Sequence, residues 1–180
     1  MKHGVYVREQ KTSVSTPVVA ESGVPFVVGT APVHSAESPA AIYTPVLCTD
    51  WEDAVKKLGY SDDWKTYTIC EVMYSHFKLF QRQPIIFCNV LNPSTNKEAV
   101  AGAEVALSGK QAKLPFDAIL SSLVVKAASS SESALVKDTD YAAYYSDGNL
   151  IVETIEDGAA KAATKLYISY DKIKTADIDD

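Results

Sequence analysis

The side chains best suited to chemistry in this sequence are thiols and imidazoles. They are three cysteines and three histidines, namely Cys48, Cys70, Cys88, His3, His34 and His76. A thiol enzyme needs a cysteine that a neighbouring histidine activates, and no local spacing joins such a pair here. The odd number of cysteines argues against a disulfide framework. We predict that the cysteines pack in the core, and a thiol enzyme remains as an alternative.

The common catalytic and phosphate-binding motifs are missing from the sequence. It contains no G-x-x-x-x-G-K-[ST], G-x-G-x-x-G, H-E-x-x-H or G-x-S-x-G pattern. Asp138-x-Asp140 and Asp147-Gly148 are fragments of a calcium loop without its other ligands, so turn formation explains them. We therefore expect a protein that is not an enzyme and that needs no metal and no cofactor.

The composition is that of a soluble globular protein. The chain has 180 residues, 47% of them hydrophobic, and a formal net charge of −6. Basic residues are scattered among acidic ones, which argues against binding to nucleic acid. No apolar run approaches the ~20 residues that cross a bilayer, and the N-terminus lacks the apolar core of a secretory signal. We expect a chain that is made in a cytoplasm and does not insert into membranes.

Residues 21–92 have the pattern of an α/β layer in the order strand, helix, helix, strand. Apolar runs at 24–30 and 85–91 predict two strands that are covered on both faces. Three prolines within 31–47 predict a crossing loop. The two strands should be parallel, with a crossover connection between them. Because two strands make a poor sheet, either an arm formed by the first residues or material from outside this chain must complete it.

Two helices are predicted between these strands. The capping box Thr49-x-x-Glu52 begins the first helix, and Gly59 supplies a left-handed stop. A second helix is expected over about 61–82, with Asp62-Asp63 serving its N-terminal dipole. Its apolar stripe recurs at helical spacing. The stripe consists of Ile69, Val72, Met73, Phe77 and Phe80.

Residues 93–176 have a different character, with short β-type runs separated by turn residues. The runs lie at 105–107, 118–126, 134–136, 141–145, 150–154 and 165–170. Asp147-Gly148 predicts a hairpin, and the even spacing predicts a small antiparallel β-sandwich or barrel. Cross-strand packing explains the late tyrosines, and a surface for a glycan or protein is the alternative. These are Tyr141, Tyr144, Tyr145, Tyr167 and Tyr170.

The first residues have the pattern of a strand with nothing nearby to pair with. Side chains alternate along Val5, Tyr6, Val7 and Arg8, as they do in a strand. Such a strand is either hidden or paired with another chain. We predict an extended arm over residues 1–20, in which these four residues add a strand to a neighbouring subunit. An edge strand of the chain's own sheet is the alternative.

The order of these segments resembles that of contractile-tail sheath proteins of myophages and phage-like particles. The resemblance covers nearly the whole chain and rests on the order of diffuse motifs, with no catalytic signature. The family continues further, so the resemblance implies that 177–180 border a missing C-terminal part that completes the sheet. The segments that carry the resemblance are Gly4–Glu9, Val24–Pro32, Thr49–Glu52, Ile85–Val90, Ser121–Val125, Leu135–Tyr141 and Leu166–Tyr170.

The resemblance implies a mechanical function. Sheath subunits form rings around a tail tube and contract to drive the tube through a target cell envelope. The implied partners are neighbouring sheath subunits and the tail tube protein, in a virion tail or phage-tail-like particle assembled in a bacterial cytoplasm. The expected fold is α+β, with a partial α/β layer, an inserted β-sandwich or barrel and an N-terminal arm. A binding module whose tyrosine-rich β-domain recognises a glycan or protein is the alternative.

Overall fold

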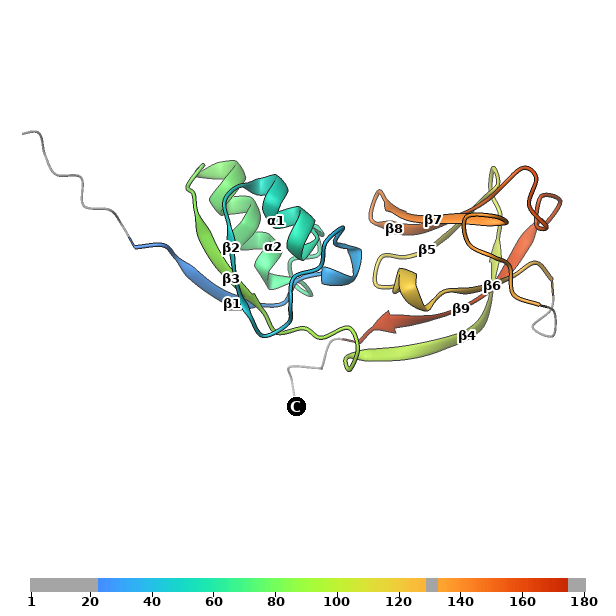
Figure 1. Ribbon diagram of the computed structural model, residues 1–180, viewed down its shortest axis with the longest axis horizontal. Coiled ribbons are helices and arrows are strands. Elements are labelled where there is room, and N and C mark those ends of the chain that lie inside the picture. The colour runs from blue at the N-terminus through green and yellow to red at the C-terminus, as the bar shows by residue number, and fades with distance from the viewer. Residues whose placement is uncertain (1–22, 129–132, 175–180) are drawn as a thin grey trace, which may run out of the picture.

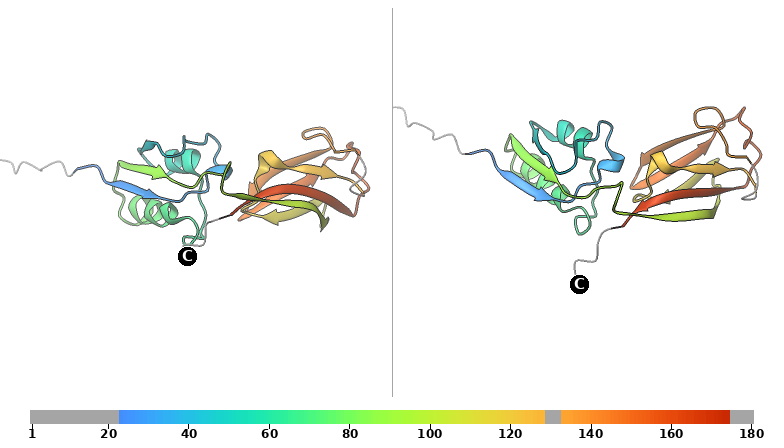
Figure 2. Two further views of the ribbon diagram at one scale, coloured as in Figure 1. Left: turned by 90° about the horizontal axis from the view of Figure 1, so that it is seen from below. Right: turned by 60° about the horizontal axis from the view of Figure 1, so that its bottom comes forward.

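The structure is a computed structural model of the chain, and it describes residues 23–128 and 133–174. These residues form two units that lie end to end (Figures 1 and 2). We call residues 23–92 the α/β unit and the described part of 93–174 the β unit. Together they hold two α-helices and three sheets of three strands each, which confirms the α+β class. None of the described sheets closes into a barrel.

The sheet of the α/β unit has the strand order β1-β3-β2. β1 (Phe26–Gly29) is parallel to β3 (Ile85–Asn89), as the sequence predicts. β2 (Pro45–Cys48) pairs antiparallel with β3, so the stretch 31–47 is not only a loop. Pro45 begins β2 on an edge of the sheet, where proline is tolerated. The chain thus supplies a third strand that the sequence prediction missed.

Helix α1 (Trp51–Leu58) packs against this sheet and has a capping residue at each end. Its N-cap is Asp50, whose Oδ1 accepts a hydrogen bond from Asp53 N at 2.8 Å. The predicted capping box is therefore one residue too early. Gly59 ends the helix with φ +73°, as predicted, and a Cβ there would lie 2.3 Å from the Pro32 carbonyl oxygen.

The second predicted helix is much shorter than 61–82. Helix α2 (Thr68–Met73) continues directly as the π-helix η2 (Tyr74–Leu79). The wider π turn changes the helical register, and Phe80 N donates to Ser75 O. Phe80 consequently leaves the predicted apolar stripe and is 70% exposed. The Asp62-Asp63 pair lies in a turn before α2, which contradicts its predicted role at a helix start.

Two three-stranded antiparallel sheets form the β unit (Figure 1). One has the order β4-β9-β6, from strands Lys97–Ala106, Lys165–Ile173 and Val124–Lys126. The other has the order β5-β8-β7, from strands Gln111–Pro115, Asn149–Thr154 and Tyr141–Ser146. Both sheets contribute to one buried core, which includes Leu114, Val125, Leu150, Val152, Leu166 and Ile168.

The hairpin between β7 and β8 forms where the sequence predicts it. Asp147 and Gly148 have φ of +49° and +67°, which a two-residue turn of this kind requires. Other strand predictions were less accurate. β5 was missed, 134–136 is not a strand, and 118–126 contains the 3-10 helix η3 (Leu120–Ser122) before β6.

The chain enters and leaves the β unit at neighbouring positions. Lys97 at the start of β4 pairs with Ile173 at the end of β9. One residue further out, Lys174 N donates to the Asn96 carbonyl oxygen at 3.0 Å. The β unit therefore has its two ends side by side, close to the α/β unit (Figure 2).

Candidate interaction surfaces

The predicted arm falls outside the described residues. The structure therefore gives no placement for Val5, Tyr6, Val7 or Arg8, nor for the predicted boundary at 177–180. The arm remains a prediction from the sequence. The surfaces below belong to the described residues alone.

One face of the α/β sheet is apolar, and no other part of residues 23–128 and 133–174 covers it. Helices α1 and α2 pack on the face that carries Val27, Val46 and Phe87. On the opposite face, Phe26 and Leu47 flank Ile86, and they are 54% and 48% exposed. The prediction that the apolar strands are covered on both faces was therefore wrong for this face.

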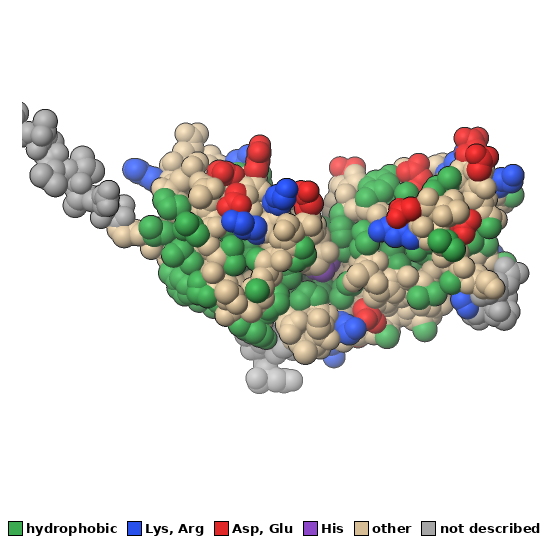
Figure 3. All heavy atoms as spheres, in the orientation of Figure 1, with side chains coloured by type: hydrophobic (Ala, Val, Ile, Leu, Met, Phe, Trp, Pro, Cys, Tyr) green, Lys and Arg blue, Asp and Glu red, His purple; other side chains and the backbone are tan. Residues whose placement is uncertain are grey.

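A second row of side chains extends the uncovered face. Val28 and Pro45 flank Cys88 across the sheet, and Val28 is 57% exposed. Figure 3 shows hydrophobic side chains gathered on the side of the α/β unit where β1 and β3 lie. We call the side chains of these two rows the open sheet face. They are Phe26, Val28, Pro45, Leu47, Ile86 and Cys88, of which Cys88 is buried between its neighbours.

The free edge of β1 borders the open sheet face. Among the described strands, β1 pairs only with β3, on one side. Its other side presents backbone N–H and C=O groups in the pattern that an added strand can match. This edge and the open sheet face together form the strongest candidate surface for protein contact in the described part of the chain.

The two units contact each other through a packed aromatic cluster. His34, on the 3-10 helix η1 (Val33–Ser35), lies 3.0 Å through Nε2 from the Phe116 carbonyl oxygen. Because a carbonyl only accepts, Nε2 carries the hydrogen, and the unprotonated Nδ1 is buried without a hydrogen-bond partner among the described residues. The His34 ring also contacts the rings of Tyr67, Phe116 and Tyr145 at centroid distances of 6.1, 5.5 and 5.8 Å. The sequence placed His34 in a loop and gave no signal for this role.

This contact makes the chain sensitive to acid. Burial lowers the pKa of His34 below its ordinary value of 6.5, and the bond to Phe116 only partly opposes this shift. Between its lowered pKa in the folded chain and the ordinary value of 6.5, the imidazole is protonated more in the unfolded chain than in the folded chain. The contribution of His34 to the free energy of unfolding is therefore fully present above that window and is lost as the pH falls through it, by at most about 1.4 kcal/mol per pH unit for one proton.

Urea unfolding at pH values between 7.5 and 5 measures this effect. The variant His34→Gln should show a flatter pH dependence than the parent chain, because it removes the titrating imidazole. His76→Gln is the matched control, because it makes the same substitution on η2, away from the contact between the two units. Equal slopes for the parent chain and His34→Gln would rule out His34 as the origin.

The cysteines pack in the structure as predicted. Cys48, Cys70 and Cys88 are all buried and free. Burial raises the pKa of Cys48 and of Cys70 to about 11, so both thiols stay protonated near neutral pH. A protonated, buried thiol is a poor nucleophile.

The late tyrosines do not form one surface. Tyr141 and Tyr170 are buried in the core of the β unit. The Tyr145 hydroxyl donates to the Ala118 carbonyl oxygen at 2.7 Å, and the Tyr144 hydroxyl bonds Glu153 at 2.8 Å. Packing and local hydrogen bonds therefore account for these four side chains.

The acidic turn residues serve the turns, as predicted. Asp140 accepts hydrogen bonds from Ala159 N through Oδ1 and from Val136 N through Oδ2. Within residues 23–128 and 133–174, no group of three or more His, Cys, Asp or Glu side chains could hold a metal ion. The helices in the same residues are too short or too polar to span a membrane.

The comparisons with known proteins add no relative. Protein-family models, curated proteins and solved structures were all compared with the chain, and none matches. The resemblance to sheath proteins therefore rests on the sequence segments named above.

Proposed function

We propose that this chain is a structural subunit, or the N-terminal part of one, of a contractile tail sheath. It polymerises around a tail tube and contracts to drive the tube through a target cell envelope. The observation that carries the proposal is the open sheet face beside the free edge of β1. A contiguous apolar surface of this kind favours contact with another polypeptide.

The path of the chain also supports this assignment. We propose a domain division into an arm (1–20), an α/β part (21–92), an inserted β-sandwich (93–176) and a boundary (177–180). Because Lys97 and Ile173 pair, the β unit can be inserted without separating the segments on either side of it. Both ends of the β unit lie close to the α/β unit (Figure 2), and a neighbouring subunit can cover the open sheet face.

The proposed assembly mechanism depends on the arm. Val5 to Arg8 pair with a sheet of an adjacent subunit, and each backbone hydrogen bond contributes ~0.5–1.5 kcal/mol net. The polar residues 10–16 act as a hinge, so the pairing persists while the folded units reorient. Head-to-tail contacts of this type build open helical polymers. The partners are then other sheath subunits and the tail tube protein, in a virion tail or phage-tail-like particle.

The alternative of a glycan- or protein-binding module has little support. It requires tyrosines that share an accessible surface, and most of the late tyrosines are used in packing or local hydrogen bonds. No described feature favours it over the assembly proposal.

Deletion of residues 1–16 tests the proposed function. In the full reading frame that encodes this chain, the deletion should abolish polymer formation and leave the subunit folded. The reason is that the arm makes contacts between subunits and none that the subunit's own core needs. Sedimentation and negative-stain electron microscopy measure the polymer, and circular dichroism measures the fold.

A pair of proline variants locates the effect within the arm. Val7→Pro removes a backbone N–H from the predicted strand and should prevent assembly. Ser13→Pro makes the same change in the polar hinge and should permit it. Polymers of normal length after the deletion, or equal effects of both prolines, would contradict the role of the arm.

A further inference from the structure

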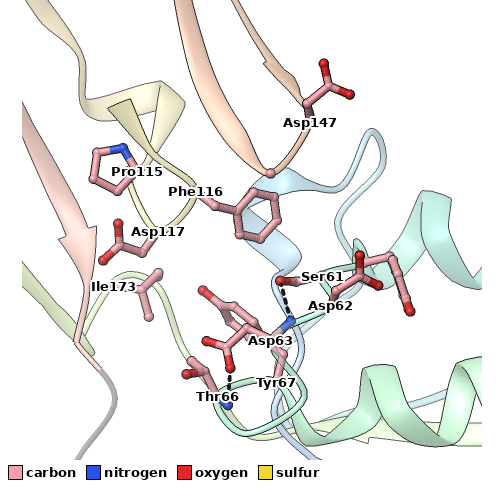
Figure 4. A pocket seen from close by; sticks show the side chains of 12 residues that line it. Ser61, Asp62, Asp63, Thr66, Tyr67, Pro115, Phe116, Asp117, Asp147 and Ile173 are labelled. Atoms are coloured by element: carbon pink, nitrogen blue, oxygen red, sulfur yellow. Dashed lines mark hydrogen bonds between the residues drawn. The ribbon is translucent and has the colours of Figure 1, made fainter. Parts of the chain in front are cut away.

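A cleft of about 660 Å³ lies between the two units. The turn before α2 forms one wall, and the segment after β5, the β7–β8 turn and Ile173 form the other (Figure 4). Its lining includes four carboxylates and no lysine, arginine or histidine. The four are Asp62, Asp63, Asp117 and Asp147.

None of these carboxylates has a cationic partner in the described residues. The six ion pairs formed there all use other acidic side chains. Burial raises the pKa of Asp117. Lys172 only partly opposes this shift, because its ammonium lies 2.7 Å from Glu98. The cleft thus gathers four carboxylates, of which Asp117 is half-buried.

Two buried polar atoms in the cleft lack hydrogen-bond partners among the described residues. Tyr67 is 2% exposed, and its hydroxyl makes no hydrogen bond to the described residues. Asp117 Oδ1 is buried and unpaired as well. Figure 4 shows the Tyr67 side chain extending from the α/β unit into the space beside Phe116 and Asp117. A buried polar group without a hydrogen-bond partner lowers the stability of the fold. A ligand that forms hydrogen bonds with these two atoms removes that penalty.

The chemistry of the lining selects the class of ligand. Two oxygens can be satisfied together by a group that only donates, as ammonium and guanidinium groups do. Phe116 lines the cleft and packs edge to face against Tyr67 at a centroid distance of 6.1 Å, and Phe116 and Ile173 offer apolar contact for a stem. A metal ion is disfavoured because the described residues contain no suitable ligand group.

We propose that this cleft binds an organic cation, an ammonium or guanidinium group on an apolar stem. The group can belong to a free amine or to a lysine or arginine side chain of a polypeptide. A second copy of this chain is a candidate source, since residues 1–12 contain Lys2, Arg8 and Lys11 against a single Glu9. The inference goes beyond the proposed sheath function and does not depend on it.

Titration of the 180-residue chain with n-butylammonium chloride tests the cleft. Trp64 packs beside the aromatic residues of the cleft, so its fluorescence should change with saturation. n-Butanol, which has the same stem without the charge, and sodium chloride should give no saturable change. Absence of saturable binding by any cationic probe would overturn the proposal.

Substitutions show whether the cation occupies this cleft. Asp117→Asn should weaken binding about tenfold, because it removes the buried charge that faces the ligand. Asp157→Asn removes an exposed carboxylate of the same unit outside the cleft and should leave the affinity unchanged. Equal weakening by the two variants would mean general charge attraction and would contradict the site.

Two peptides identify the source of the cation. One has the sequence of residues 1–12, and the other has glutamine in place of Lys2, Arg8 and Lys11. Binding of the first at least tenfold tighter than n-butylammonium, with loss in the second, assigns the cleft to a polypeptide side chain. Equal or weaker binding of the peptide assigns it to a free amine. Both outcomes support the cation site.

A measurement without ligand checks the unpaired hydroxyl. Tyr67→Phe removes the orphan oxygen and keeps the ring, so the melting temperature of the free chain should stay constant or rise. The same variant should bind n-butylammonium several-fold more weakly. A fall in melting temperature of more than about 5 °C would show that the hydroxyl has a partner in the free protein, and would overturn the argument.

Discussion

The variant Asn89→Leu should lower the free energy of unfolding of the α/β unit by about 3 kcal/mol. Asn89 is 2% exposed, at the end of β3, and its Oδ1 accepts from Ala31 N at 2.9 Å and from Leu91 N at 3.0 Å. Its Nδ2 donates to the Leu91 carbonyl oxygen at 3.0 Å. Leucine has a similar volume but leaves these backbone groups buried and unpaired, which costs ~1–3 kcal/mol for each group.

Tryptophan fluorescence during urea unfolding measures this loss, because both tryptophans, Trp51 and Trp64, lie in the α/β unit. Asn92→Leu is the matched control. Its Oδ1 accepts a hydrogen bond from Ser94 N in an exposed turn, so the same substitution should cost less than about 1 kcal/mol. If both variants lose a similar free energy of unfolding, the buried hydrogen bonds of Asn89 do not contribute the stability assigned to them.

The variant Phe87→Ala should cost about 3–5 kcal/mol, a large part of the total stability of a domain this size. Phe87 is fully buried on the central strand of the sheet, between Val27 and Val46. Its ring also contacts Phe77 from η2 at a centroid distance of 6.4 Å. Removal of the ring leaves a cavity where the sheet meets the helices, and the rigid backbone of β3 limits its collapse.

Phe80→Ala makes the same chemical change at a side chain that is 70% exposed. It should lower the free energy of unfolding by no more than about 0.5 kcal/mol. The comparison also tests the π-helix, because an uninterrupted α-helix would bury Phe80 on the predicted stripe. A large loss from Phe80→Ala would contradict the register of η2.

The elements that the sequence predicted well are those with strong local signals. Gly59 ends α1 because few other residues tolerate its positive φ, and Asp147-Gly148 forms the hairpin for the same reason. The parallel pairing of β1 and β3 follows from an apolar strand before and after a helical segment. Each of these depends on neighbours within a few residues or on a general rule of chain topology.

The elements that the sequence missed depend on distant residues. β2 is a short strand whose first residue is proline, and it forms because β3 offers an edge to pair with. β5 alternates polar and apolar residues too briefly to be recognised alone, and pairing with β8 specifies it. The π-helix at η2 carries no local signature in the sequence, which instead suggested a regular stripe ending at Phe80.

The same division applies to the candidate sites. Three features can be read from the residues in order: the absence of the common catalytic motifs, the segment order behind the sheath resemblance and the predicted arm at Val5 to Arg8. The open sheet face and the cleft that holds Tyr67 and Asp117 become visible in the folded chain alone. Local propensities act between near neighbours, whereas exposure and unpaired polar atoms depend on which distant segments pack together.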